Sequence, residues 1–330
     1  MTITSAERHL VSCVIVNWNT RDLLLQCVDA LPSALGNIPH EIIVVDNASS
    51  DGSTDAIRTR YPGMCLIANQ QNSGFAAGVN DGIKKARGHY LLILNPDIIP
   101  SSESIQSLIH TFKHDDHIGM VSPELVNPDG SSQLGYVYKY PSLMQVLLFH
   151  TVLNSWASGQ DRLARRYYQH VSTKSGGWEE VQILAGACMF VKREVIDSIG
   201  LMDERFHLFY EDVDWCYRMI GKGWKLVVDH DVVWKHIGGQ SFTVGDRSWV
   251  YARFEMSVLA FIDKHGTFVQ RAISKLILLV NGVVMAGVNR FLLFLTADDK
   301  RTAREQKVTK YQLFLNAFWR KYIQRDEAVR

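Results

Sequence analysis

The stretch that decides the fold is EIIVVDNASSDGS, residues 41–53. An unbroken run of Ile and Val leads directly to an acidic residue, Asp46, and then to a loop of small polar residues. Such a run, without polar alternation, is typical of a strand that is buried on both faces of a parallel sheet. Open α/β sheets bind ligands at the carboxyl ends of their strands, which is where Asp46 would lie. The stretch therefore predicts a covered parallel sheet with a polar ligand site at one edge.

Three further signatures place polar residues beside an apolar run or a helix start. They are VIVNWN at 14–19, NSGFAAGVN at 72–80 and HYLLILNPD at 89–97. Segments with helical spacing of apolar residues alternate with the apolar runs, which predicts an α/β fold with a mostly parallel sheet. The predicted strands cover 11–16, 41–46, 64–69 and 89–97, and the predicted helices cover 20–35, 54–60 and 78–87.

The second part of the chain regains regular patterns after an irregular middle. Residues 136–180 are aromatic, basic and contain many Gly and Ser, so we expect a mobile excursion there. Beyond residue 246 the pattern is helical, which predicts an α/β domain over 1–245 and a helical extension over 246–330. The other predicted elements are a helix at 101–113, a strand at 120–126, a turn at 127–131, a strand and a helix within 181–200, a helix at 211–221 and a strand at 224–239.

Composition indicates an intracellular globular protein with an uneven charge. The hydrophobic share of 47% is enough for a large core. The five cysteines form no close pairs, which predicts free thiols in a reducing compartment, and the N-terminus lacks the pattern of a signal peptide. The net charge of +1 argues against nucleic-acid binding. Residues 264–330 nevertheless hold 13 Lys and Arg against 5 Asp and Glu, which indicates a basic appendage.

Two of the early signatures suit a nucleotide, although each also has a simpler interpretation. A carboxylate at the end of a strand, as at Asp46, can accept a hydrogen bond from the ring N–H of a pyrimidine. The same residue type often only caps the turn that follows a strand. The Gly residues and the helix start of NSGFAAGVN suit a close approach to phosphate. Tight packing would explain them equally well, and Asn80 could be a polar residue on a helix surface.

Two later signatures carry acidic and imidazole groups. FYEDVDW, residues 209–215, holds Glu211, Asp212 and Asp214 in an aromatic setting. A carboxylate there could serve as a general base, or the acids could simply stabilise the first turn of a helix. His236, in KHIGG at 235–239, could ligate a metal ion or contact a diphosphate, while an isolated His is often structural.

The order of these motifs closely resembles the family 2 inverting glycosyltransferases of the GT-A fold, in particular their bacterial rhamnosyltransferase branch. The resemblance covers about residues 11–240. It implies a Rossmann-like, mostly parallel sheet flanked by helices. It also implies that the donor is bound within about 1–125 and the acceptor within about 126–245.

The resemblance implies roles for individual residues. Asp46 would read a uracil or thymine ring. LNPD, 94–97, occupies the slot of the family's DxD motif with Asn95 in place of the first Asp, which leaves Asp97 and His236 to hold Mg²⁺ or Mn²⁺. Asp212 would be the base, with Glu211 orienting it or touching the donor. The remaining residues that would contact the nucleotide sugar are Asn17, Asn19, Asn72, Gly74, Asn80, Asn95 and Gly186, the last of these in LAGACMF.

The activity implied by the resemblance is an inverting single displacement. The expected donor is dTDP-L-rhamnose, and the expected acceptor is a lipid-linked saccharide used for cell-surface polysaccharide such as O-antigen. One alternative is a UDP-hexose donor, and another is an inactive protein that binds carbohydrate. A nucleotidyltransferase would need a basic, Gly-rich loop after the first strand, which NWNTRD at 17–22 does not supply.

The C-terminal extension contains apolar runs at 276–288 and 291–295, interrupted by Asn281 and by Asn289–Arg290. About 20 consecutive apolar residues are needed to cross a bilayer, so we expect these runs to be too short. Basic residues flank them, which favours a helix at about 270–300 lying on the cytosolic face of the inner membrane. The alternative is a helix packed on the catalytic domain or across a homodimer.

Overall fold

The computed structural model describes residues 10–133, 139–160, 162–163, 166, 176–238 and 248–324. The chain divides into two compact units. The sheet unit comprises 1–139, 169–207 and 211–243. The helical unit comprises 140–168, 208–210 and 244–330.

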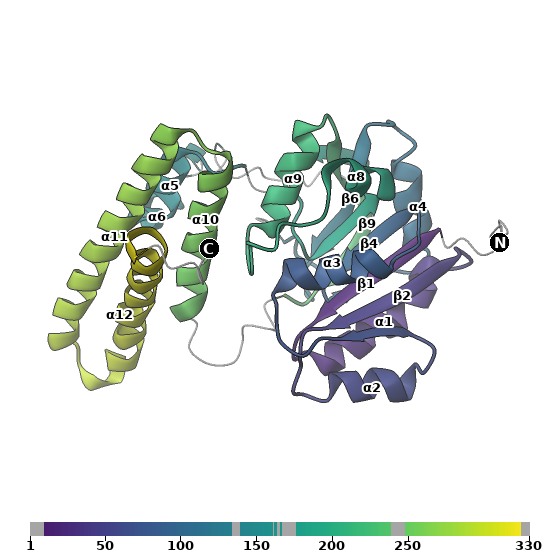
Figure 1. Cartoon of the computed structure of the whole chain (residues 1–330), viewed down its shortest axis with the longest axis horizontal. Coiled ribbons are helices and arrows are strands. Elements are labelled where there is room, and N and C mark those ends of the chain that lie inside the picture. Colours follow the sequence, from purple (N-terminus) through teal and green to yellow (C-terminus); the bar gives the residue numbers. More distant parts are fainter. Residues whose placement is uncertain are drawn as a thin grey trace. The chain divides into compact units, whose positions relative to one another are not determined.

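The sheet unit is built on a mixed sheet that is mostly parallel, as predicted (Figure 1). Its strand order is β3-β2-β1-β4-β8-β6-β9-β5, with β7 paired to β9. Among these strands, β8 runs antiparallel to both of its neighbours, while β6 and β9 are parallel to each other. The strands are β1 (Val11–Asn17), β2 (His40–Asp46), β3 (Cys65–Ala68), β4 (Tyr90–Leu94), β5 (Ile98–Ile99), β6 (Ile118–Val126), β7 (Trp178–Val181), β8 (Cys188–Lys192) and β9 (Lys225–His236).

Helices cover both faces of the central strands because the side chains of β1 alternate between two apolar layers. Cys13 and Ile15 share one buried cluster with Leu24 of the first helix. On the other face, Gly82 of the third helix lies so close to Val14 that an added methyl group would come within 2.2 Å of its Cγ1 atom. The helices of this unit are α1 (Arg21–Leu35), α2 (Ser53–Arg60), α3 (Phe75–Lys85), α4 (Ser104–Thr111), α8 (Arg193–Ile199) and α9 (Glu211–Gly221).

The strand predicted at 89–97 ends earlier than expected. β4 stops at Leu94, and the chain passes through Pro96 to the short strand β5, which pairs with the end of β9. Proline has no N–H to donate to a sheet ladder, which is why the strand cannot continue through it. The residues between β4 and β5 therefore leave the plane of the main ladder at the carboxyl edge.

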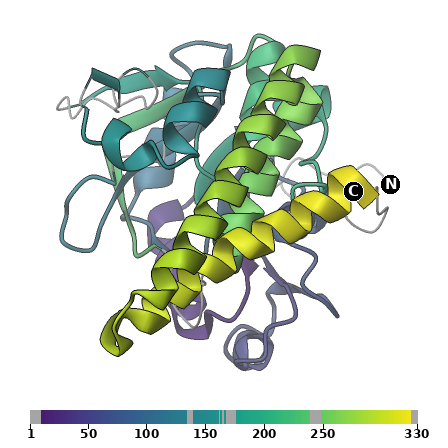
Figure 2. The ribbon, with the colours of Figure 1, turned by 90° about the vertical axis from the view of Figure 1, so that its left-hand side faces the viewer.

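The helical unit contains one long helix where the sequence shows two apolar runs separated by Asn289–Arg290. α11 runs without a break over 27 residues, beginning at a capping box formed by Thr267 and Gln270. Asn281 does not interrupt it, because its side chain accepts a hydrogen bond from the N–H of Val152, 3.0 Å away. α12 packs along α11 where Gly282 leaves room for the ring of Phe314 (Figure 2). The elements are α5 (Leu143–Phe149), α6 (Asn154–Ala157), α10 (Ser248–His265), α11 (Phe268–Phe294), α12 (Asp298–Phe318) and the π-helix η3 (Trp319–Gln324).

The helical unit takes in a segment from the part of the chain that was expected to form the acceptor half. The boundary expected at 245 falls outside the described residues, and residues 140–168, expected in the acceptor half, belong to the helical unit. The reason is a buried polar contact: His150, after α5, lies 3.0 Å from a carboxylate oxygen of Glu255 in α10. The expected excursion at 136–180 lies partly outside the described residues, and its described parts contain α5, α6 and the start of β7.

Candidate active site

The carboxyl ends of β1 and β2 bring Asn17 and Asp46 together. The two residues are register partners, and both side chains are buried. The Asn17 amide donates to a carboxylate oxygen of Asp46 at 2.8 Å and to the Ser49 hydroxyl at 3.1 Å. The Thr20 hydroxyl in turn donates to the side-chain amide oxygen of Asn17 at 2.8 Å. Asn17 therefore positions the Asp46 carboxylate and is itself held by the start of α1.

Asp46 also holds the turn that follows it. Its other oxygen accepts from the Ser49 N–H at 2.9 Å, so the turn-capping interpretation is correct as far as it goes. A carboxylate offers about four acceptor sites, and a nucleobase N–H could still use one of them. Asn19, with a φ of +53°, accepts from the Ser50 N–H at 2.8 Å and fixes the same loop.

The start of α3 lies beside this loop. The Asn72 side chain accepts from the Gly74 N–H at 2.9 Å, and Asn47 donates to the Gly74 carbonyl at 3.0 Å. Gly74 has a φ of +93°, and a methyl group there would fall 2.3 Å from the carbonyl oxygen of His207. Only glycine fits, because both the backbone angle and the space exclude a side chain.

Asn80 is occupied in packing α3 against the segment that follows α8. Its amide donates to the Met202 carbonyl at 2.9 Å and to Glu204 at 2.8 Å, and its oxygen accepts from the Met202 N–H at 3.0 Å. The side chain is buried, so its interpretation as a helix-surface residue was wrong. These contacts favour a structural role for Asn80 over direct contact with a donor.

Asp97 and His236 meet beyond the ends of β4 and β9. His236 Nε2 lies 3.4 Å from Asp97 Oδ1. Asp97 is only 7% exposed, and this buried oxygen has no hydrogen-bond partner among the described residues. Buried polar atoms are nearly always paired, so an orphaned carboxylate oxygen points to a missing ligand. Asn95 is held nearby through its backbone N–H, which donates to the Ala187 carbonyl at 2.9 Å.

Gln133 orients the imidazole of His236 and was missed by the sequence analysis. The side-chain oxygen of Gln133 lies 2.7 Å from His236 Nδ1, and its side-chain NH₂ group donates to the backbone carbonyl of His236 at 2.7 Å. The Nδ1 contact leaves Nε2 facing Asp97, the arrangement by which a second residue commonly orients a metal-binding histidine. An isolated Gln after a turn carries no sequence signal that would reveal this pairing.

The Asp97–His236 pair fits the expected cofactor. The described part of the chain holds no cluster of three metal-binding side chains. Mg²⁺ and Mn²⁺ at nucleotide sites, however, commonly take one or two protein ligands and complete their shells with substrate phosphates and water. A carboxylate oxygen and an imidazole nitrogen are suitable donors for such a site.

Glu211 and Asp212 begin α9. Asp212 accepts from the Gly186 N–H at 2.8 Å with one oxygen and from the Val213 N–H at 2.8 Å with the other. Burial raises the pKa of Asp212. Burial and the neighbouring charge of Asp212 raise the pKa of Glu211 well above its usual range, and Glu211 Oε2 has no partner among the described atoms. Both carboxyl groups are therefore set in conditions that favour holding a proton.

The third carboxylate of the motif is structural. Asp214 is fully buried and lies 2.9 Å from the guanidinium of Arg218, one turn along α9. Arg218 also donates to the carbonyls of Ile199 and Leu201 at 2.7 and 2.8 Å. The pair thus fixes α9 to the segment after α8, and it leaves Asp212 and Glu211 as the candidates for chemistry.

Gly186 links the acidic helix start to the other two groups of residues. Its N–H binds Asp212, and a methyl group at this position would lie 3.1 Å from the ring of Phe75 at the start of α3. The next residue, Ala187, accepts the hydrogen bond from Asn95. The structure therefore joins the ends of β1, β2 and β4, the start of α3 and the start of α9 along one edge of the sheet.

Comparison with known proteins agrees with this arrangement. The chain is 26% identical over 249 residues to an N-acetylglucosaminyl-diphospho-decaprenol L-rhamnosyltransferase of Mycobacterium tuberculosis, covering 69% of this chain and 76% of that protein. It is 24% identical over 212 residues to the low-salt glycan biosynthesis hexosyltransferase Agl10 of Haloferax volcanii, covering 63% of this chain and 61% of the relative.

The fold and the family are also shared with characterised glycosyltransferases. The solved mannosyltransferase PcManGT of Pyrobaculum calidifontis, in complex with GDP-Man and Mn²⁺, superposes with a TM-score of 0.54 at 17% identity, covering 95% of this chain and 88% of that one. Residues 8–252 match the family described as Glycosyltransferase like family 2. The chain therefore belongs to the family 2 glycosyltransferases and has their GT-A fold.

Proposed function

We propose that this glycosyltransferase moves L-rhamnose from dTDP-L-rhamnose to a lipid-linked saccharide, by single displacement with inversion at the anomeric carbon. The proposal depends on one observation. Hydrogen bonds of the adjacent residues Gly186 and Ala187 connect the acidic start of α9 with the end of β4, and β4 leads to Asp97. The similarity to the mycobacterial rhamnosyltransferase supports the donor and the lipid-linked acceptor.

The nucleotide end of the donor is assigned to Asp46. Its carboxylate is held rigidly by Asn17 and by the Ser49 N–H, and it retains acceptor capacity for the ring N–H of thymine or uracil. Asn72 and Gly74 place the start of α3 beside the same loop, and a helix N-terminus is a suitable place for a phosphate. Asn19 shapes the loop that would contact the ribose side.

The diphosphate end is assigned to Asp97 and His236, which would hold a Mg²⁺ or Mn²⁺ ion. Such an ion would supply positive charge that offsets the charge of the leaving nucleoside diphosphate. The residues of the chain supply the support: Gln133 fixes the imidazole, and the backbone contact with Ala187 fixes Asn95.

The base is assigned to Asp212. As the acceptor oxygen bonds to the anomeric carbon and the bond to the diphosphate breaks, Asp212 takes the proton of the acceptor hydroxyl. The hydrogen bonds from Gly186 and Val213 hold the carboxylate in place, and burial raises its pKa, so it is a stronger base than an exposed Asp. We therefore expect activity to fall as the pH drops through this raised pKa.

A UDP-hexose donor is the alternative. Similarity to the Haloferax hexosyltransferase favours it, and an Asp at position 46 suits uracil as well as thymine. The other alternative, an inactive protein that binds carbohydrate, loses support because the family membership indicates glycosyltransferase activity.

Peripheral attachment to the cytosolic face of the membrane is also proposed, through the outward face of α11. By length and composition α11 could cross a membrane, so the expectation of a run too short for that was wrong. On its other face, however, residues such as Leu278 and Gly282 are buried. A helix with one packed face is suited to lying along a lipid surface. Apolar side chains including Leu276 and Phe291 are exposed, and no Asp or Glu occurs from 264 to 297.

The donor assignment is tested by thermal shift with dTDP-, UDP- and GDP-sugars, each with Mg²⁺ or Mn²⁺. We expect the largest stabilisation with dTDP-L-rhamnose, and we expect Asp46→Ala to reduce the preference for dTDP- and UDP-sugars over GDP-sugars. The control is Asp51→Ala, which removes an acidic side chain from the same loop at a residue without a proposed donor contact. A larger rise in melting temperature with a UDP-hexose would identify that sugar nucleotide as the donor in place of dTDP-L-rhamnose. A preference for a GDP-sugar would overturn the role of Asp46.

A further inference from the structure

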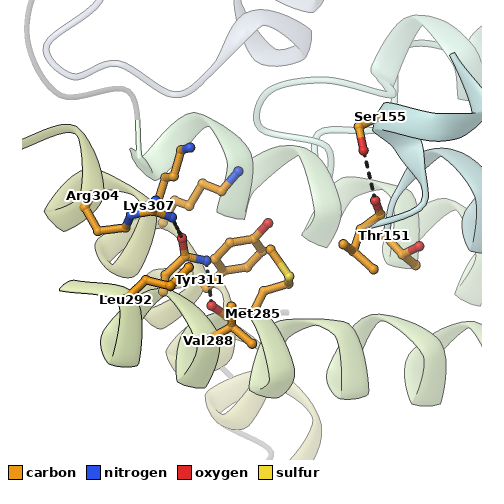
Figure 3. A pocket seen from close by; sticks show the side chains of 11 residues that line it. Thr151, Ser155, Met285, Val288, Leu292, Arg304, Lys307 and Tyr311 are labelled. Atoms are coloured by element: carbon orange, nitrogen blue, oxygen red, sulfur yellow. Dashed lines mark hydrogen bonds between the residues drawn. The ribbon is translucent and has the colours of Figure 1, made fainter. Parts of the chain in front are cut away.

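A pocket of about 330 Å³ lies within the helical unit, and none of the residues assigned to sugar transfer lines it (Figure 3). Its walls come from the segment between α5 and α6, from α11 and from α12. The lining contains no acidic residue. It combines a cationic wall with an apolar one, and neither has a role in the proposed sugar transfer.

The cationic wall consists of Arg304, Lys307 and Lys310, which follow one stripe of α12. None of the three forms an ion pair among the described residues, and the side chain of Arg304 donates a hydrogen bond to the side-chain amide oxygen of Asn289 at 3.0 Å. Burial and the charge of Lys307 lower the pKa of Lys310. Glu255, whose charge acts on Lys310, is engaged by His150. Lys310 Nζ lies over the rings of Tyr251 and Tyr311, 4.5 and 4.7 Å from their centroids. Arg304 and Lys307 therefore supply positive charge that no described carboxylate pairs.

The apolar wall consists of Met285, Val288 and Leu292 of α11. Val288 is 44% exposed and Val152, on the opposite side, is 56% exposed, so apolar side chains also form part of the rim. A small inorganic anion would leave this wall without a partner. A ligand with an anionic head and an attached hydrocarbon chain would contact both walls.

We infer that this pocket binds the phosphate group of a membrane lipid, with the hydrocarbon chain leaving over Val288. Two or three adjacent cations suit a phosphate, which can carry two negative charges, and an arginine can donate two parallel hydrogen bonds to it. The pocket can hold a phosphate head and the first atoms of its chain. The inference concerns residues outside the proposed transfer site and is independent of which sugar is transferred.

The test uses full-length protein and dioctanoyl phosphatidic acid below its micellar concentration, measured by calorimetry. Wild type should bind it, and Arg304→Gln/Lys307→Gln should bind at least about tenfold more weakly because two charge-assisted contacts are lost. Lys300→Gln/Arg301→Gln removes the same two charges from the same helix outside the pocket and should bind within about twofold of wild type. Circular dichroism melting checks that both variants fold.

Inorganic phosphate and a third variant identify the source of the ligand. Inorganic phosphate should bind wild type much more weakly than the lipid, and Val288→Gln should weaken lipid binding without changing phosphate binding. Equal affinity for phosphate and lipid would overturn the lipid assignment in favour of a free-phosphate site. Equal loss in the pocket and control variants, or no binding by wild type, would overturn the site itself. Hydrolysis of dTDP-L-rhamnose without lipid should be the same in all these variants, which separates this inference from the proposed function.

Discussion

The sheet unit and the helical unit place their polar groups in opposite ways. At the sheet edge, Asn17, Asp46 and Gln133 are held by short hydrogen bonds, while Asp97 and Glu211 each have a buried oxygen without a hydrogen-bond partner among the described residues. In the helical unit, a cationic pocket and an exposed apolar helix face lack this kind of internal pairing. We propose that the first unit positions the reacting groups and that the second contacts an amphiphile.

The largest effect that would sharpen this comparison is expected at Asp212. Asp212→Asn removes the proton acceptor while preserving the side-chain volume and the contact with Gly186. Turnover should fall by about 10²–10⁴-fold. Calorimetry should find donor affinity within a few-fold of wild type. Unchanged turnover would remove Asp212 from the mechanism and make Glu211 the next candidate.

Asp214→Asn is the matched control because the same substitution falls two residues away. It leaves Arg218 without its carboxylate partner, so we expect it to lower the free energy of unfolding by about 3–5 kcal/mol. The folded fraction should keep near-normal turnover per molecule. Denaturant unfolding and active-site titration separate the effect on stability from the effect on turnover. A loss of turnover per folded molecule as large as that of Asp212→Asn would show that the roles of Asp212 and Asp214 are assigned wrongly.

The next effect concerns Gln133, which orients His236 without touching the proposed metal ion. Gln133→Ala should weaken the activation of the enzyme by Mn²⁺ about 10–100-fold, since partners of metal-binding residues typically have effects of this size. Raising the Mn²⁺ concentration should restore most of the rate. Full activity of wild type in excess EDTA would contradict a metal role for Asp97 and His236 together.

A smaller effect is expected on the exposed face of α11. Leu276→Asp/Phe291→Asp places two charges where side chains are 60% and 64% exposed, so the fold should tolerate them. Partitioning onto vesicles with anionic lipid should fall about tenfold. Removing 270–330 is a poorer test, because it would also remove α12, which packs on α10 and contacts it through the rings of Tyr311 and Tyr251. Equal partitioning of wild type and variant would favour a dimer or packed-helix role for this face.

The smallest effect is expected at Glu211. Because burial raises its pKa above the unfolded value, the folded state prefers the protonated form. The stability that this preference contributes is present below the unfolded pKa and is lost as the pH rises toward the folded one. Glu211→Gln stays neutral, so its melting temperature should exceed that of wild type by a few degrees at pH 8 and match it at pH 4. A lower melting temperature at pH 8 would mean that the charged form is stabilised by a contact.

Sequence reasoning located the sheet edge well because its signals are local. An apolar run that ends in a polar residue specifies both a strand and the position of its end, which is why Asp46 and the turn after it could be anticipated. The presence of Glu211 at the start of α9 followed from the acidic first turn. Roles that the sequence assigned to donor contacts at individual residues stay predictions.

Tertiary pairings at long sequence distance could not be anticipated. Gln133 and His236 are 103 residues apart, and Asn281 pairs with Val152 across 129 residues. A lone Asn in an apolar run suggests an interruption unless its partner is known. Asn80 pairs with Met202 and Glu204 across 122 and 124 residues, so these contacts were hidden for the same reason, and its contact with the donor stays a prediction.

The most direct test of the division of labour measures two properties on two variants. Hydrolysis of dTDP-L-rhamnose and binding to anionic vesicles are compared for Asp212→Asn and for Leu276→Asp/Phe291→Asp. We predict that the first variant loses hydrolysis and keeps vesicle binding, while the second keeps hydrolysis and loses vesicle binding. Loss of both properties in both variants, or hydrolysis that survives Asp212→Asn, would contradict the assignment of sugar-transfer chemistry to the sheet unit and membrane contact to the helical unit.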